Sequence, residues 1–249
     1  MIPKKIHYCW FGGKPLPKLA EKCIASWKKY CPDYEIILWN ESNYDFTKHP
    51  YMKQALDAKK WAFISDYARL DIVYQHGGIY LDTDVEIIKP LDPLLENELY
   101  MGFESHEHVN SGLGFGAEAG HPLIKKMMED YDNYSFINED GSLNLTTSPM
   151  IQTKFLSTMG LCNDSGKIQT ISGCAKIYPS DFFAPKSYIT NKIIITQNTY
   201  SIHHYDGSWL PLKVKIRKSI LFFLMKKIGI ERTLKLTKLK KKVFSYFTK

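Results

Sequence analysis

Gly77-Gly78-Ile79-Tyr80-Leu81-Asp82-Thr83-Asp84 is the stretch from which the fold can be inferred. A glycine pair ends a helical pattern, apolar residues form a short buried strand, and two aspartates follow with one residue between them. On an extended chain, residues i and i+2 face the same side, so Asp82 and Asp84 can converge. Two such carboxylates suit a hard divalent cation that holds phosphates. Because ligands of open α/β sheets bind where strands end, a metal and phosphate site is predicted at that edge.

The chain around this stretch alternates between strand and helix patterns. Residues 5–10 and 35–39 are predicted strands joined by a helix that ends before Pro32, a unit typical of parallel sheets. A further helix is predicted over residues 59–76. Shorter strands are predicted at 85–88, 100–104, 112–116, 167–172, 193–196 and 200–204, and helices at 121–134 and 150–159. We therefore expect an α/β fold with a mixed, mainly parallel central sheet flanked by helices.

Length and composition exclude several classes of protein. The chain has 249 residues, of which 44% are hydrophobic and 14% aromatic, and this excludes disorder and allows a large core. Its 5 cysteines include no CxxC pair, so free thiols are expected rather than a zinc ribbon or a disulfide scaffold. Neither a signal peptide nor a transmembrane anchor is expected, because the run at 220–225 is too short to cross a bilayer. A cytoplasmic location follows as an expectation.

The charge is divided unevenly along the chain. From Lys213 onward, 13 lysines and arginines face one acid, Glu231, so this tail carries +12 and the remainder −5. We place a boundary near Pro211, with a catalytic domain over 1–211 and a basic amphipathic helical tail over 212–249. A cationic helix with Phe and Leu along one side predicts binding to an anionic membrane, peripherally on its inner face. The alternative is a helix packed on the enzyme or a partner. Nucleic-acid binding is not expected, because the tail has only two arginines and the body is acidic.

Several motifs together carry a family resemblance. The segments 64–69 (ISDYAR) and 76–84 (HGGIYLDTD) resemble the sugar-transferase signature of glycosyltransferase family 32. Residues 6–13 (IHYCWFGG) are similar to the opening strand of that family, and 203–209 (HHYDGSW) to its closing motif. The same pattern resembles the catalytic domain of large clostridial glucosylating toxins. The resemblance runs from about residue 2 to residue 210, and the tail lies outside it.

The resemblance implies a GT-A-like fold and a metal-dependent transferase that uses Mn²⁺ or Mg²⁺. The implied donor is a nucleoside-diphosphate sugar, with a UDP-hexose favoured, and the implied acceptor is a glycan or lipid-linked glycan. It also implies retention of anomeric configuration and a role in surface or capsular polysaccharide synthesis. Sugar and acceptor identity are set by the shape of the pocket, which no motif reports.

The resemblance also implies roles for residues near the aspartate pair. Asp66 is implied to bind donor sugar hydroxyls and Arg69 to contact the sugar or phosphates; the alternative for this i, i+3 pair is a plain ion pair. Asp84 is implied to hold the cation, with Asp82 nearer the ribose and sugar. Trp10 is implied to stack on the base, the alternative being a core tryptophan.

Roles further along the chain are implied as well. The segment that begins at Asn110 would leave room for donor or acceptor hydroxyls. His204 is implied to be the third metal ligand, while His203 should face the other way on a strand. Ser208 and Trp209 match a mobile lid over the leaving diphosphate, the alternative being a simple domain-terminal turn.

Two other functional classes fit parts of the sequence. Residues 81–85 (LDTDV) match the DxDx[TV] text of haloacid-dehalogenase-like phosphatases. That family needs a later acidic pair such as GDxxxD, and the sequence contains none. A non-catalytic nucleotide-sugar binding module is the other alternative, although all the expected polar groups are present.

Overall fold

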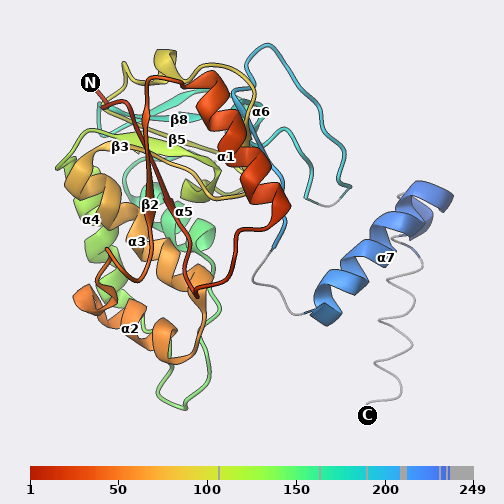
Figure 1. Cartoon of the computed structure of the whole chain (residues 1–249), viewed down its shortest axis with the longest axis horizontal. Coiled ribbons are helices and arrows are strands. Elements are labelled where there is room, and N and C mark those ends of the chain that lie inside the picture. Colours follow the sequence, from red (N-terminus) through yellow and green to blue (C-terminus); the bar gives the residue numbers. More distant parts are fainter. Residues whose placement is uncertain are drawn as a thin grey trace. The chain divides into compact units, whose positions relative to one another are not determined.

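The computed structural model describes residues 1–105, 107–162, 164–188, 190–207, 212–229, 231–233 and 235 (Figure 1). The chain forms two compact units. The first comprises Met1–Pro185 and Ile194–His204, and the second comprises Lys186–Ile193 and Tyr205–Lys249. The boundary proposed from the sequence, between 211 and 212, stays a prediction.

The described elements follow one another in α/β order. The strands are β1 (Lys5–Cys9), β2 (Glu35–Trp39), β3 (Gly78–Tyr80), β4 (Val85–Ile87), β5 (Leu99–Gly102), β6 (Phe115–Ala117), β7 (Gln169–Ile171), β8 (Ala175–Tyr178) and β9 (Ser201–His203). The helices are α1 (Lys18–Tyr30), α2 (Pro50–Asp57), α3 (Trp61–His76), α4 (Pro122–Asp130), α5 (Ser148–Thr158), α6 (Ser180–Phe183) and α7 (Leu212–Ile228). Short 3₁₀ turns lie at η1 (Phe46–Lys48), η2 (Asp92–Leu94), η3 (Ser111–Leu113) and η4 (Tyr131–Asn133).

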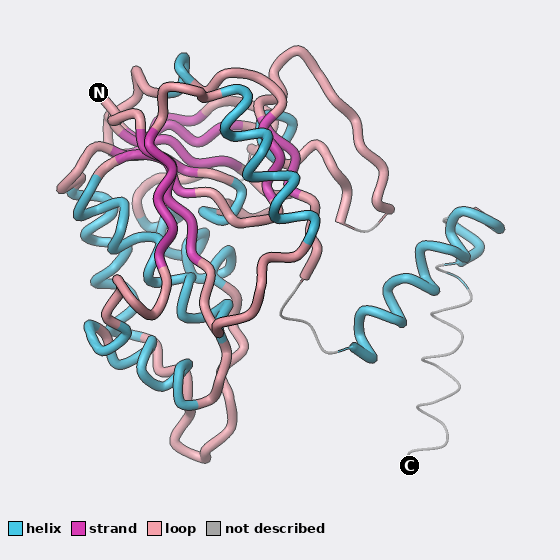
Figure 2. The backbone as a smooth tube through the Cα atoms, in the orientation of Figure 1, coloured by secondary structure: helices cyan, strands magenta, loops and turns pink. Residues whose placement is uncertain are grey.

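The described strands form a central sheet in the order β2-β1-β3-β6-β5-β8-β7 and a small second sheet of β4 and β9. In the central sheet, β2, β1, β3, β5 and β8 run in one direction, and β6 and β7 run against them. Figure 2 shows these strands gathered together with the helices around them. The predicted class, α/β with a mixed, mainly parallel sheet flanked by helices, is confirmed.

Alternate residues of each central strand enter two separate apolar cores. Tyr80 faces the core that also contains buried residues of α2, α3, α4 and α5. Its neighbour Ile79 faces the other core, which is built with α1. Trp27 of α1 is fully buried there, and its Nε1 donates to the carbonyl oxygen of Val85 at 2.7 Å. The segment after Asp84 is thereby fixed to α1.

The predicted glycine stop of α3 is confirmed. Gly77 has φ 61° and Gly78 has φ 106°, values that L side chains rarely adopt. A Cβ on Gly78 would also lie 2.9 Å from the Lys5 carbonyl oxygen of β1. The ring of His7 in β1 hydrogen-bonds the Gly77 carbonyl oxygen at 2.8 Å, and burial lowers the pKa of His7 to about 4. The glycine pair therefore lets β3, the strand that leads to Asp82 and Asp84, begin directly against β1.

Two predicted strands differ from the structure. The strand predicted at 112–116 is divided into η3 and β6, because Asn110 caps the turn and Gly114 takes φ 117°. The strand predicted at 193–196 is wrong: the structure records one isolated bridge there, between Lys186 and Ile193. Within the described residues, no helix combines the length and apolar character needed to span a bilayer.

Candidate active site

Polar side chains from distant parts of the sequence meet at one edge of the central sheet. Trp10 follows β1, Asp82 lies two residues after β3, and Glu104 lies two residues after β5. These strands run in the same direction, so their carboxyl ends share that edge. The antiparallel strand β6 returns from the edge, which brings the preceding Asn110 to it. This is the edge at which α/β sheets bind ligands.

A buried guanidinium links two of the predicted site residues. The side chain of Arg69 in α3 is 5% exposed, and its Nη2 lies 2.8 Å from Asp66 and 3.5 Å from Asp82. Its Nε donates to the carbonyl oxygen of Ser65 at 3.0 Å, and its Nη1 donates to Ser111 at 3.4 Å. The predicted pair of Asp66 and Arg69 is therefore a buried cluster that includes Asp82. Arg69 pairs directly with the Asp66 and Asp82 carboxylates, while its contact with a ligand stays a prediction.

Burial governs the protonation of the two carboxylates beside Arg69. It raises the pKa of Asp66 to about 6, against the opposing effect of the Arg69 charge and a hydrogen bond from Ser148 of α5. It also raises the pKa of Asp82, an effect that the Asp84 charge reinforces. Both groups therefore carry a negative charge at a cost, and a nearby cation would relieve that cost.

Asp82, Asp84 and His203 form a group suited to a metal ion. Their candidate ligand atoms all lie within 4.8 Å of one another. The aspartates converge through a turn, in which the Val85 amide donates to the Asp82 carbonyl oxygen at 3.0 Å, and not through the extended chain predicted from the sequence. The pairing of β9 with β4 sets Val85 opposite His203, and the His203 ring nitrogen Nε2 lies 3.0 Å from Asp84. The charges of Asp84 and Asp82 raise the pKa of His203 although burial acts to lower it.

The structure places the ring of His203, and not that of His204, beside Asp84, while the identity of the metal ligand stays a prediction. His204 was predicted to complete the metal group, but its ring lies 2.7 Å from Glu86, which also accepts from Lys22 at 2.9 Å. The ring of His203 lies in the place beside Asp84 that the sequence analysis assigned to His204. Side chains alternate along β9, as the prediction assumed, but the pairing with β4 gives the opposite phase.

Sequence reasoning missed Glu104. It lies in a hairpin closed by a bridge between Phe103 and Val109, and its amide donates to the His108 carbonyl oxygen at 2.7 Å. Burial raises the pKa of Glu104, while the charge of His203 and a hydrogen bond from Asn110 act to lower it. Asn110 is buried, and its Oδ1 accepts from the Gly112 amide at 2.6 Å. The available signal was an acidic residue at the carboxyl end of the strand predicted at 100–104.

Trp10 lies in a tight loop after β1. It is partly exposed, and its Nε1 donates to the Lys14 carbonyl oxygen at 2.6 Å. The neighbouring Gly12 has φ 94°, and a Cβ there would lie 3.0 Å from the ring of Trp61. The ring of Trp10 is thus held by the loop and remains partly open to solvent. The predicted lid residues, Ser208 and Trp209, lie outside the described residues.

A second group of possible ligands, Glu98, His121 and Cys174, lies at the opposite strand ends. His121 Nδ1 accepts the Leu123 amide at 3.2 Å as the cap of α4. The proton of the neutral ring is then on Nε2, which lies 3.7 Å from Cys174. Histidines that bind metals usually donate from their second nitrogen, so this group fits a metal ion less well.

Part of the chain is similar in sequence to known proteins. Residues 17–101 match the family model described as "Glycosyltransferase sugar-binding region containing DXD motif". Inositol phosphoceramide mannosyltransferase 3 of Schizosaccharomyces pombe is 32% identical over 54% of this chain and 38% of its own length. Mannosyl phosphorylinositol ceramide synthase SUR1 of Saccharomyces cerevisiae is 29% identical over 55% of this chain and 37% of its own length. The chain thus spans well under half the length of these relatives.

Among solved structures, the PaToxG glycosyltransferase is 21% identical with a TM-score of 0.49, over 63% of this chain and 69% of that one. In this chain, the mixed sheet carries the DXD segment at its carboxyl edge.

Gly112 tests whether the position of Asp82 matters. A Cβ on Gly112 would lie 2.2 Å from Asp82 Oδ2 and 2.9 Å from Arg69 Nη1. We therefore expect Gly112→Ala to displace Asp82 and to weaken Mn²⁺ binding, measured by calorimetry, by about ten-fold or more. Gly166→Ala is the matched control, because the nearest atom to its Cβ would be at 3.4 Å. Equal Mn²⁺ affinity in the two variants would contradict the assignment.

His203 and His204 provide a matched pair for a second test. Because His203 lies against Asp84 and His204 against Glu86, we expect His203→Gln to lower Mn²⁺ affinity by about ten-fold or more. His204→Gln should have a much smaller effect. Mn²⁺ titrations followed by electron paramagnetic resonance measure both. A larger loss in His204→Gln would restore the assignment made from the sequence.

Proposed function

We propose that this chain, whose residues 17–101 carry the DXD-containing sugar-binding region of glycosyltransferases, is a metal-dependent hexosyltransferase. It moves a sugar from a nucleoside diphosphate, most simply UDP, to a glycan or lipid-linked glycan. Transfer proceeds with retention of configuration and serves surface or capsular polysaccharide synthesis. The names of the two yeast relatives, which specify mannosyl transfer to inositol-containing lipids, support a lipid-linked acceptor.

The observation that carries the proposal is the convergence of Asp82, Asp84 and His203 at the sheet edge. With Asp66 and Glu104 nearby, the described site has four carboxylates and one guanidinium, that of Arg69. This excess of negative charge suits a divalent cation. Two carboxylates suit manganese or magnesium, and the imidazole favours manganese of the two. When bound there, the cation neutralises charge on the departing diphosphate.

The chain's own residues hold the donor. Asp84 and His203 approach the diphosphate end, and Asp82 lies between them and the Asp66–Arg69 pair, where sugar hydroxyls would bind. The partly exposed ring of Trp10 offers a face to the base. Asn110, whose Oδ1 accepts from the Gly112 amide and whose side-chain amide donates to Glu104, can offer its second amide N–H to the sugar.

Retention without a named nucleophile favours attack on the same face from which the diphosphate leaves. The acceptor oxygen bonds to the anomeric carbon, the bond from that carbon to the phosphate oxygen breaks, and the acceptor proton passes to the departing phosphate. Such a reaction depends on position more than on a strong base.

The second unit supports a peripheral location on the inner face of a membrane. Ile216, Ile220 and Phe223 of α7 recur at i, i+4 and i+7 and are 51%, 55% and 60% exposed. Lys213 and Lys227 on the same helix are exposed as well. An exposed apolar stripe beside cations matches an anionic bilayer surface. A lipid-linked acceptor would then share that surface with the enzyme.

Asp84 gives the direct test of metal-dependent transfer. We expect Asp84→Asn to lower release of UDP from a UDP-hexose about 100-fold or more while circular dichroism stays unchanged, because the variant loses a metal ligand. A chelator should do the same to the wild type, and manganese should restore activity. Asp140→Asn, at an exposed loop, is the control. Full activity of the chelated enzyme, across a panel of nucleotide sugars, would contradict the proposal.

The exposed stripe of α7 gives a test of membrane binding. Replacing Ile216, Ile220 and Phe223 together by Ser should abolish sedimentation with vesicles that contain anionic lipid, because each buried apolar side chain contributes to binding. Replacement of Leu145 and Ile168 by Ser, also exposed but in the first unit, should have no effect. Equal sedimentation of the two variants, or insensitivity to salt, would refute membrane binding through α7.

A further inference from the structure

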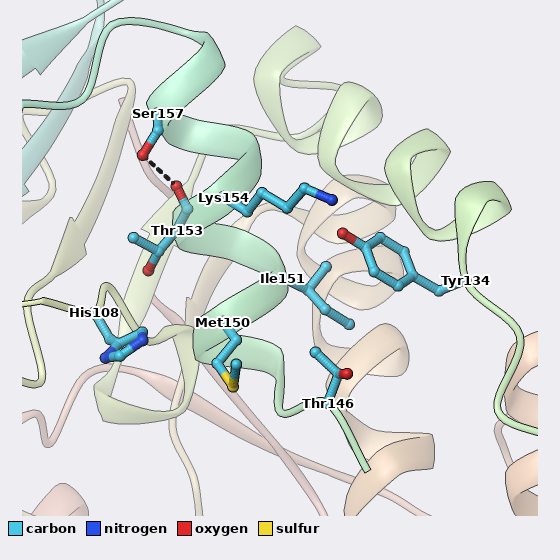
Figure 3. A pocket seen from close by; sticks show the side chains of 8 residues that line it. All are labelled: His108, Tyr134, Thr146, Met150, Ile151, Thr153, Lys154 and Ser157. Carbon is cyan, nitrogen blue, oxygen red and sulfur yellow. Dashed lines mark hydrogen bonds between the residues drawn. The ribbon is translucent and has the colours of Figure 1, made fainter. Parts of the chain in front are cut away.

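A hollow of about 410 Å³ lies beside the candidate active site, and its volume falls within the usual range of small-molecule pockets. Figure 3 shows side chains from α5 at its centre, with His108 and Tyr134 on either side. None of the residues that line this hollow is assigned to the donor site.

Two structural elements connect the hollow to the reaction centre. The hairpin after β5 carries Glu104, near Asp82 and His203, and His108, which lines the hollow. Helix α5 contributes Ser148 to a hydrogen bond with Asp66. The hollow and the donor site therefore share two walls.

Helix α5 divides its residues between the two sites. Gln152 Nε2 donates to Ser111 at 2.7 Å, and Ser111 in turn accepts from Arg69. Thr153 and Lys154, the next residues of the helix, line the hollow. Thr153 Oγ1 accepts from the Val109 amide at 2.9 Å and so fastens the hairpin to the helix. A ligand in the hollow would therefore contact a different face of α5 from the one that reaches Ser111 and Arg69 through Gln152.

The chemistry of the hollow differs from that of the donor site. Among the described residues that line it, Lys154 is the permanent cation and there is no carboxylate. The Lys154 ammonium lies 5.8 Å from the centre of the Tyr134 ring. Tyr134 and Met150, the latter 51% exposed, provide apolar surface of the kind that packs against a sugar ring. Lysine is a point charge well suited to a phosphate oxygen.

We infer that the hollow binds the acceptor and that this acceptor carries a phosphate group, which pairs with Lys154. The inference rests on the proposed transferase function, because it assigns the second substrate of that reaction. The carboxylates of the donor site repel a second anion, so a phosphate on the acceptor is stabilised only where a cation stands apart from them. The phosphate thereby orients the sugar with its hydroxyl towards the reaction centre.

Binding of a hexose phosphate, measured by ligand-observed NMR without any donor, tests the inference independently of turnover. We expect a hexose 1-phosphate to bind the full chain, the same hexose without phosphate to bind at least ten-fold more weakly, and Lys154→Glu to remove that difference. Lys29→Glu is the matched control, because Lys29 is also an exposed helical lysine beside a tyrosine ring, at 4.8 Å. It lies on α1, whose buried residues belong to the other core.

A second arm distinguishes the two sources of the phosphate. A hexose linked through phosphate to a lipid in neutral vesicles is presented to the α7 Ser variant, which keeps Lys154. Binding of the free hexose phosphate with the Lys154 dependence supports a soluble acceptor, and binding of the vesicle form alone with that dependence supports a lipid headgroup. Equal binding of charged and neutral sugars, or an equal loss in Lys29→Glu, would overturn the inference. Failure of UDP release in the wild type would overturn the proposed function while leaving this binding result standing.

Discussion

The guanidinium of Arg69 is the interaction on which the candidate active site depends. It is buried, and it joins Asp66 of its own helix to Asp82 of the DXD segment. Removal of one partner from such a cluster would leave an uncompensated buried charge, which is strongly destabilising. Arg69 nevertheless balances only part of the negative charge, because Asp84 and Glu104 lie close by. The remaining excess of negative charge supports the proposal that the same cluster binds a cation.

Backbone pairing brings the other half of the site to this cluster. The small sheet of β4 and β9 sets His203 against Asp84, although the two residues are 119 positions apart in the sequence. Trp27 fixes the start of β4 to α1, and the contact of His204 with Glu86 fixes the end of β9. Structural residues on both sides of the small sheet therefore determine the distance between His203 and the carboxylates.

Much of this arrangement could be predicted from local sequence rules. The i, i+3 spacing of Asp66 and Arg69 and the glycine stop before the DXD segment predicted the contact and the strand start that the structure contains. The phase of His203 and His204 could not be predicted, because it depends on the register of β9 against β4, a pairing between distant segments. Glu104 was missed for a related reason: its approach to Asp82 depends on β6 pairing with both β3 and β5. The need for a glycine at position 112 could not be predicted either, because Asp82 occupies the space where a Cβ would lie.

We propose that one cation site, built from Asp82, Asp84 and His203, lies at the carboxyl edge of the sheet. Crystals of the protein soaked with Mn²⁺ and UDP, measured at a wavelength where manganese scatters anomalously, test it directly. We expect one strong anomalous peak within coordination distance of both aspartates and His203 Nε2, with the diphosphate beside it. A peak between His204 and Glu86, or the diphosphate bound away from the aspartates, would contradict it.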